Sequence, residues 1–294
     1  MSGTSSGAVV VGFDLSESSR RAVRWAARES AGRGRSLLLV HVLTWPFEEH
    51  AAIRVPGEGN VVEPLQQALR RELAGLVEEC HEVDPRMEVR SELPFGDPVQ
   101  VLAAMAVDAE LLVLGGPQLE AAVGLGATSA ELLATRGGSP VVVVRDGRDI
   151  AESAPVVVGV DGSATSRAAI GFAFDFASRN RCDLVGVHAW SDLPLDPFSW
   201  VGKWELPWSE VREDAEGLVA ESLAGWGERY PDVKVRRVVT PEKPRQALLR
   251  EAEQASLLVV GSHGRGRVRR SLLGSVSHAV VNRAPCPVAV LRAA

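Results

Sequence analysis

The sequence predicts an α/β protein made of two tandem domains, each a doubly wound parallel sheet of five strands. Three observations support this: short apolar runs without polar alternation, helical patterns between those runs, and a repetition of the whole arrangement along the chain. Alternation of strand and helix with short connections is typical of right-handed crossovers in a parallel sheet. With 294 residues, the chain is long enough for two hydrophobic cores.

Runs rich in Val and Leu mark the expected strands, because strands buried on both faces of a parallel sheet need no polar alternation. In the first domain we expect strands near 8–13, 36–44, 87–93, 110–115 and 140–145. In the second domain we expect them near 155–160, 183–190, 233–240, 256–261 and 287–292. Helical patterns of the first domain lie near 17–33, 63–83, 97–107 and 127–136, and the second domain repeats them.

The repetition is visible in the residues themselves. The run Val9-Val10-Val11-Gly12-Phe13-Asp14 returns as Val156-Val157-Val158-Gly159-Val160-Asp161, and Val40-His41 returns as Val187-His188 at the same offset. Apolar strands look alike in all parallel sheets, but this does not explain Gly and Asp at matching places. We therefore expect domains at 1–146 and 154–294, joined by a short polar stretch.

Composition limits the classes of function. The proportions of hydrophobic (46%) and charged (24%) residues are ordinary for a globular protein, and the net charge of −6 argues against general binding to nucleic acid or anionic membrane. The three cysteines, Cys80, Cys182 and Cys286, are far apart, which suggests reduced thiols. The first seven residues do not resemble a signal peptide, and the apolar runs are too short for a membrane span. We expect a cytoplasmic protein with no membrane partner.

Two long segments, 45–62 and 190–207, follow the second strand of each domain and are rich in Pro and Trp. Long connections in compact domains often cover functional sites. The alternative, which we favour, is that the tryptophans pack over an exposed sheet end or between the halves.

The segment that indicates chemistry follows the expected strand at 256–261. Gly261, Gly264 and Gly266 lack a Cβ, so backbone N–H groups there can approach an anion closely. Gly274 and Ser275 lie where a helix should begin, and a helix N-terminus favours negative charge. We therefore interpret 261–275 as a phosphate-binding loop. The alternative is a flexible turn followed by a helix that Ser275 merely caps.

An acidic residue matches this loop. Asp161 lies just past the first strand of the second domain, and ligands of doubly wound sheets bind where neighbouring strands diverge from the sheet centre. If the first and fourth strands flank that point, Asp161 and Gly261 meet over one crevice. The carboxylate could then accept hydrogen bonds from ribose hydroxyls or a base amine. The alternative for Asp161 is a turn or helix-capping residue.

With these motifs, the chain resembles a tandem universal stress protein of the ATP-binding type. The resemblance lies in Val158–Ser163, Val187-His188 and the spacing of Gly261, Gly264, Gly274 and Ser275, and it spans nearly the whole chain. It implies a fold like that of the adenine nucleotide alpha hydrolases, and pairing of the copies into a pseudo-dimer through strands near 141–144 and 288–291. It implies that Asp161 and Val187 contact ribose and adenine, while the loop holds the phosphates. The expected ATP-contacting set in the second copy is Gly159, Asp161, Val187, Gly261, Ser262, Gly264, Arg265, Gly266, Arg267, Gly274, Ser275, Val276 and Ser277.

The first copy departs from this pattern. It retains Gly12 and Asp14, but Pro117 removes a backbone donor, Glu120 brings negative charge and Ala127 lacks a hydroxyl. We therefore expect weaker or no ATP binding there. The corresponding candidate residues are Gly12, Asp14, Val40, Gly116 and Gly126.

No clear catalytic base or metal motif is evident in the sequence. His41 and His188 recur at strand ends, where a bond to the backbone is the plainer account, and His263 is expected to face solvent. The leading hypothesis is an ATP-dependent stress regulator that presents a nucleotide-sensitive surface to a protein partner, with at most slow hydrolysis. An adenylate-forming enzyme of the related α/β class and a scaffold that binds no nucleotide are the alternatives. A requirement for Mg²⁺, the choice among adenine nucleotides and formation of a homodimer stay open.

Overall fold

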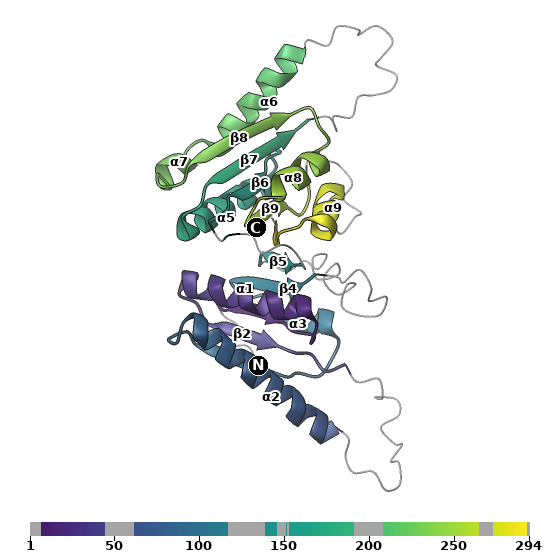
Figure 1. Ribbon diagram of the computed structural model, residues 1–294. Helices are drawn as coiled ribbons and strands as arrows, with labels where there is room; N and C mark the ends of the chain where they lie inside the picture. The colour runs from purple at the N-terminus through teal and green to yellow at the C-terminus, as the bar shows by residue number, and fades with distance from the viewer. Residues whose placement is uncertain are drawn as a thin grey trace. The chain divides into compact units, whose positions relative to one another are not determined.

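A computed structural model describes residues 7–44, 62–116, 139–145, 151, 153–190, 208–264 and 273–292. The chain divides into two compact units, Met1–Asp146 and Gly147–Ala294 (Figure 1). Each unit is a parallel five-stranded sheet flanked by helices, which confirms the predicted fold class. Within the described residues, none of the helices is both long and apolar enough to cross a membrane.

The first unit has the strand order β3-β2-β1-β4-β5, with every described pairing parallel. Its elements are β1 (Val9–Gly12), α1 (Glu17–Arg33), β2 (Leu37–Val40), α2 (Val62–Val83), β3 (Val89–Glu92), α3 (Pro98–Ala106), β4 (Leu111–Gly115) and β5 (Val141–Val144). The predicted helix at 127–136 lies outside the described residues.

The second unit repeats this arrangement in the order β8-β7-β6-β9-β10, again with parallel pairing. Its elements are β6 (Val156–Gly159), α5 (Ala164–Asn180), β7 (Leu184–Ala189), α6 (Trp208–Leu223), α7 (Trp226–Arg229), β8 (Val235–Thr240), α8 (Pro244–Ala252), β9 (Leu257–Gly261), α9 (Ser275–Arg283) and β10 (Val288–Leu291). The pairing of the two copies that the resemblance implies stays a prediction.

The strands inside each sheet are apolar on both faces, whereas the edge strands β3 and β8 carry exposed charged residues. Every residue of β2 and β5 is buried, as are the first three residues of β1 and of β6. The predicted strand at 36–44 was too long, since the ladder from β2 to β3 ends at Val40 and only a single bridge, between Leu43 and Phe95, continues it. The Pro94 carbonyl accepts from the Leu43 N–H, so this stretch is held as an irregular extension.

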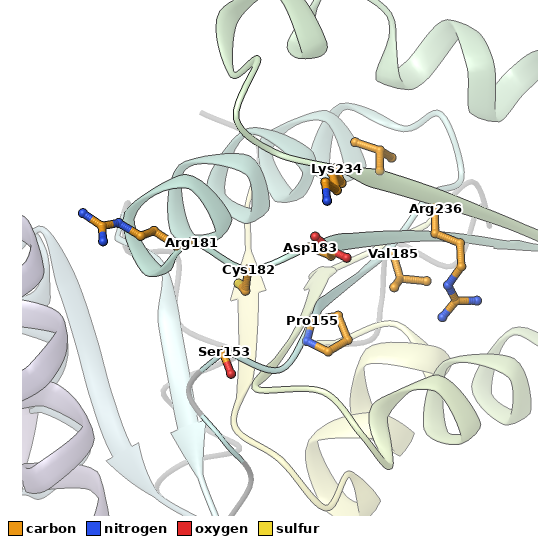
Figure 2. A pocket seen from close by; sticks show the side chains of 9 residues that line it. Ser153, Pro155, Arg181, Cys182, Asp183, Val185, Lys234 and Arg236 are labelled. Carbon is orange, nitrogen blue, oxygen red and sulfur yellow. The ribbon is translucent and has the colours of Figure 1, made fainter.

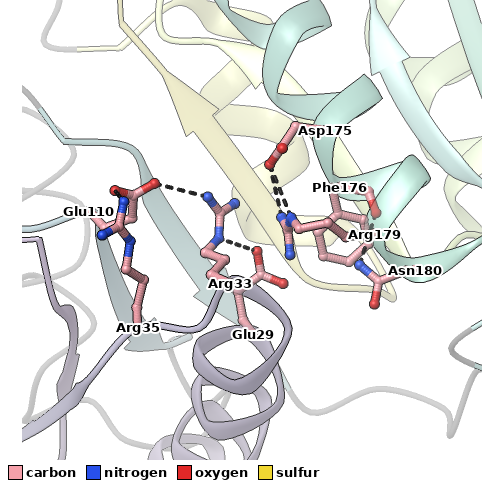
Figure 3. A network of polar contacts seen from close by, with 8 residues as sticks. All are labelled: Glu29, Arg33, Arg35, Glu110, Asp175, Phe176, Arg179 and Asn180. Carbon is pink, nitrogen blue, oxygen red and sulfur yellow. Dashed lines mark hydrogen bonds and ion pairs between the residues drawn. The ribbon is translucent and has the colours of Figure 1, made fainter. Parts of the chain in front are cut away.

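The helices begin and end at residues whose chemistry fits those places. Ser16 and Ser163 cap α1 and α5 by accepting hydrogen bonds from the N–H groups of Ser19 and Ser166. At the other end, Gly34 terminates α1 in the left-handed conformation. Ion pairs then fix the last turn of α1: Arg33 contacts the buried Glu29 at 2.6 Å and Glu110, just before β4, at 3.1 Å (Figure 3). These contacts tie α1 to the start of a central strand.

The three cysteines are free and buried. Burial raises the pKa of the Cys286 thiol to about 12 and that of the Cys80 thiol to about 11, and it also raises the pKa of Cys182. Because the thiolate is the reactive form, none of them is an active nucleophile at neutral pH.

The turn after the first strand carries a strained residue in the first unit. Leu15 has φ of 71°, whereas its counterpart Gly162 has φ of 76°. A positive φ places the Cβ of an L-residue too close to the carbonyl oxygen and costs about 1–2 kcal/mol, but glycine avoids that cost. Leu15 is also 48% exposed, so little burial compensates for the strain.

We therefore expect Leu15→Gly to raise the stability of the first unit by about 1 kcal/mol. The reverse change, Gly162→Leu, should destabilise the second unit by a similar amount. Thermal unfolding would measure both, with shifts of about 2–4 °C in opposite directions. A lower Tm for Leu15→Gly would contradict the strained backbone at this turn.

Candidate functional site

The two strands at the centre of the second sheet place the candidate site. β6 pairs in register with β9, from Val156 opposite Leu257 to Val158 opposite Val259. The crossover from β6 leads to one neighbour, β7, and the chain returns to β9 on the other side. The first and fourth strands therefore flank the switch point of the sheet, as the sequence predicts, and a crevice is expected at their carboxyl ends.

Asp161 lies just beyond β6, after Val160, and is held by a short network of hydrogen bonds. Its Oδ1 accepts a hydrogen bond from the N–H of Ser163 at 2.9 Å, and its own N–H donates to the Ser166 hydroxyl at 3.1 Å. Oδ1 thus stabilises the turn after β6, which is the role that the alternative interpretation gave to Asp161. The other oxygen, Oδ2, accepts no hydrogen bond among the described residues.

That second oxygen faces the start of the glycine-rich loop. A Cβ on Gly264 would lie 2.7 Å from Asp161 Oδ2, and apart from the chain neighbours of Gly264 no other described residue lies within 4 Å of it. The preceding residue is anchored to α5, because the Thr165 hydroxyl donates to the carbonyl of His263. The structure therefore brings Asp161 and the 261–264 turn together beyond the carboxyl ends of β6 and β9, and Gly264 leaves room for the carboxylate.

Gly261 has a different reason to be glycine. Its Cβ would lie 2.6 Å from Thr165 Oγ1 and 3.1 Å from the Thr165 backbone carbon. In the first unit, a Cβ on Gly115 would lie 2.8 Å from the backbone nitrogen of Ser19. The end of the fourth strand thus passes close to the first helix in both units. Gly261 is required by this packing whether or not a ligand binds.

The loop returns to the place where it began. The N–H of Gly274 donates to the Ser262 carbonyl at 2.8 Å, and the Ser277 hydroxyl donates to the carbonyl of Gly261 at 2.6 Å. Ser277 is buried and its hydroxyl holds the end of β9, so the ATP contact expected of Ser277 stays a prediction. The buried Ser262 likewise contributes its carbonyl to this closure.

The helix that follows has an exposed, uncapped beginning. α9 starts at Ser275 as predicted, with Gly274 as its N-cap and no side-chain cap hydrogen bond. Ser275 is therefore the first helical residue and not the cap, which removes the alternative interpretation of its role. Ser275 is exposed and Val276 is half-buried in the same turn, and a helix N-terminus without a side-chain cap favours an anion.

The remaining predicted residues of the second copy either belong to strands of the sheet or lie outside the described residues. Gly159 ends β6, and a Cβ there would make only ordinary contacts with Leu248 and Val260. Val187 is buried and its carbonyl accepts from the N–H of Val160, so an adenine contact by Val187 stays a prediction. Three predicted loop residues lie outside the described residues: Arg265, Gly266 and Arg267.

Both recurring histidines bond to the backbone, as predicted. His188 Nδ1 lies 2.6 Å from the carbonyl oxygen of Val160, and His41 Nδ1 lies 2.8 Å from that of Phe13. The half-buried His263 has its Nδ1 3.2 Å from the Ser262 hydroxyl, so it does not simply face solvent.

The first unit presents a different surface at the matching place. Asp14 receives hydrogen bonds from both the N–H and the hydroxyl of Ser16, so its carboxylate is held more firmly within its own turn. The aliphatic part of Arg145 covers Gly116, where the Cβ of any other residue would overlap it. Gly12 ends β1 and Val40 ends β2, where Val40 is buried. Pro117, Glu120, Gly126 and Ala127 lie outside the described residues.

A separate cavity of 350 Å³ lies at the opposite edge of the second sheet, near the amino ends of β6, β7 and β8 (Figure 2). It is lined by Ser153, Pro155, Arg181, Cys182, Asp183, Val185, Lys234, Val235 and Arg236. Arg236 is paired with Glu251 at 2.7 Å, and the figure shows Arg181 directed away from the other residues. None of the residues predicted to bind nucleotide lines this cavity.

The two units together define a class of protein: tandem α/β domains with a glycine-containing turn after the fourth strand of each parallel sheet. Comparisons with known proteins agree with this class. A family model described as the universal stress protein family matches residues 7–145 and again residues 153–292. The chain therefore belongs to the universal stress protein family.

Individual relatives match the chain over nearly its whole length. A universal stress protein from Mycobacterium tuberculosis is 40% identical over 296 residues, which cover 97% of this chain and 96% of the relative. One from Mycolicibacterium smegmatis is also 40% identical, with the same coverage. The crystal structure of a universal stress protein from Archaeoglobus fulgidus has the same fold, with a TM-score of 0.66, 20% identity and coverage of 98% of both chains.

Proposed function

We propose that the second unit binds ATP or a related adenine nucleotide, and that the protein acts as a regulator whose nucleotide-bound surface is recognised by a protein partner. The observation that carries the proposal is the meeting of Asp161 with the 261–264 turn beside the uncapped start of α9. A carboxylate oxygen available to hydroxyl or amine donors thus lies next to a backbone region suited to anions. A nucleotide carries groups that match both: hydroxyl and amine donors for the carboxylate, and phosphate anions for the backbone region. These groups lie within one small molecule, so a single nucleotide could contact both parts of the site.

In this arrangement Asp161 Oδ2 would accept from the ribose, while the phosphates would lie against the loop and the first turn of α9. Arginines of the loop, among them Arg265 and Arg267, would add positive charge. Any Mg²⁺ would be held chiefly by the phosphates, because no cluster of three or more His, Cys, Asp or Glu side chains suited to a metal occurs among the described residues.

The proposed role is binding rather than turnover. The Nδ1 atoms of His188 and His263, the described histidines beside the crevice, already contact a carbonyl and a hydroxyl. Isothermal titration with ATP, ADP and cyclic AMP would test the binding and rank the nucleotides. Absence of heat and of any co-purified nucleotide in mass spectrometry would favour the scaffold alternative. Stoichiometric pyrophosphate release would favour the adenylate-forming alternative.

Gly264→Ala is a sharp test of this site. The new Cβ would overlap Asp161 Oδ2 without touching the backbone of another element, so the carboxylate must move while the fold remains. We expect ATP affinity to fall by about tenfold, the loss typical of one hydrogen bond to a charged group. Gly217→Ala in α6 is the matched control, because nothing lies within 4 Å of its Cβ.

Titration of both variants beside the unaltered protein would measure the effect, with circular dichroism to check the fold. Equal affinity in Gly264→Ala and the unaltered protein would mean that Asp161 and Gly264 do not bind the nucleotide together.

A further inference from the structure

His188 lies one strand away from the candidate site, yet it contacts the peptide group that carries Asp161. The Val160 carbonyl oxygen, 2.6 Å from His188 Nδ1, belongs to the bond between Val160 and Asp161. A carbonyl only accepts hydrogen bonds, so Nδ1 must carry the proton and Nε2 is the other ring nitrogen. The His188 side chain, on β7, therefore holds the peptide group immediately before Asp161 through a hydrogen bond.

The other restraints on this peptide come from different directions. The N–H of Asp161 donates to the Ser166 hydroxyl of α5 at 3.1 Å, and Ser163 holds Oδ1 at 2.9 Å. The β-ladder fixes the Val160 N–H, which donates to the Val187 carbonyl at 2.8 Å. The carbonyl of Val160 lies beyond the last ladder pair between β6 and β7, at Gly159 and Val187, and His188 supplies the bond there. Without it, the peptide plane could rotate and carry Asp161 Oδ2 away from Gly264.

We propose that His188 is a positioning residue for the nucleotide: it orients the Val160–Asp161 peptide so that the free carboxylate oxygen faces the crevice. This inference rests on the proposed function of the second unit. It gives His188, which is outside the expected ATP-contacting set, a measurable effect on the affinity for ATP. The effect is indirect, since His188 acts through Asp161.

The first unit supplies a natural control, because it has the same bond without the same site. His41 grips the Phe13 carbonyl before Asp14, just as His188 grips that of Val160. If the histidines only stabilised the strand ends, replacing either one would lower stability equally and leave the affinity for ATP unchanged. A positioning role separates them: only the change at His188 should alter tight ATP binding.

The experiment compares His188→Ala, His188→Asn, His188→Gln and His41→Ala in the full chain by isothermal titration with ATP. His188→Ala should weaken binding by about three- to tenfold, the equivalent of one net hydrogen bond. The Asn side chain places an N–H donor where Nδ1 stands and should restore affinity to within about twofold, whereas Gln places its donor near Nε2 and should not. His41→Ala should bind ATP as the unaltered protein does, with a loss of thermal stability similar to that of His188→Ala.

The outcomes separate this inference from the proposed function. Failure of the unaltered protein to bind any adenine nucleotide would overturn the proposed function itself. Binding by the unaltered protein with equal affinity in His188→Ala, or an equal loss in His41→Ala, would overturn only the positioning role. If His188→Ala does not fold, the difference between the Asn and Gln variants decides the question, and equal affinities of those two would contradict the inference.

Discussion

Replacing Asp161 with alanine is expected to lower ATP affinity by roughly ten- to 150-fold, the largest loss from any single side chain of the candidate site. The carboxylate would make a charge-assisted hydrogen bond, for which removal typically costs about 1.5–3 kcal/mol. Its Oδ2 faces Gly264 and accepts no other bond among the described residues, so the bond to ligand would be lost without a substitute. Isothermal titration at constant salt would measure the change.

Asp14→Ala is the matched control for this measurement. Asp14 occupies the equivalent place after β1, but its Oδ1 accepts hydrogen bonds from both the N–H and the hydroxyl of Ser16, whereas Asp161 Oδ1 accepts only from the N–H of Ser163 among the described residues. We expect this variant to retain the tight ATP site unchanged. A large loss of affinity in Asp14→Ala with little in Asp161→Ala would place the nucleotide in the first unit and reverse the assignment of the two copies.

Gly261→Ala is expected to destabilise the second unit by about 1–3 kcal/mol, whether or not ATP is present. The added methyl would lie 2.8 Å from the Thr165 Cβ and 3.1 Å from its backbone carbon, and a helix backbone does not yield as a flexible side chain does. Strand β9 must therefore move away from α5. Denaturant unfolding would report the change as a lower midpoint with a similar slope.

Gly217→Ala provides the opposite expectation in the same unit. Gly217 lies within α6 with open space around its Cα, so alanine should stabilise by about 0.5–1 kcal/mol. An unchanged midpoint in Gly261→Ala would contradict the close packing of β9 on α5. Loss of ATP binding in Gly261→Ala would say little about phosphates, since the same change disturbs the fold.

The sequence predicts the architecture well because strand burial leaves a strong pattern. Val9–Gly12 and Val156–Gly159 are apolar runs with the same ending, and they form the first strand of each sheet. Their repetition predicts two copies, and the order of strands follows from right-handed crossovers. Strand ends are less well predicted: residues 41–44 suggest a strand, but only the isolated bridge between Leu43 and Phe95 continues the pairing of β2.

The candidate site was predictable in its parts but not in the purpose of each residue. The approach of Asp161 to the 261–264 turn follows from the switch-point rule, and the start of α9 follows from Gly274 and Ser275. Close backbone contact leaves no signature except glycine itself, so Gly261 looked like part of a phosphate cradle although it packs on α5. Ser277 looked like a donor to a ligand because the carbonyls that it bonds are invisible in sequence.

The positioning role of His188 could be suspected only from the repetition. Both copies have a Val-His pair near the end of the second strand, Val40-His41 and Val187-His188, which indicates a shared task. Which atom each imidazole grips depends on how the adjacent strand ends, and that is a matter of three-dimensional register.

The bond between the Gly274 N–H and the Ser262 carbonyl makes the loop a closed detour from the sheet. The loop therefore joins the rest of the second unit at the same two residues, Ser262 and Gly274, whatever the sequence between them. Insertions, deletions or charge changes between these two residues should therefore change the free energy of unfolding little, since lengthening a closed loop adds little entropy cost. A different ligand preference can therefore arise from changes inside this segment while the sheet and helices of the second unit stay the same.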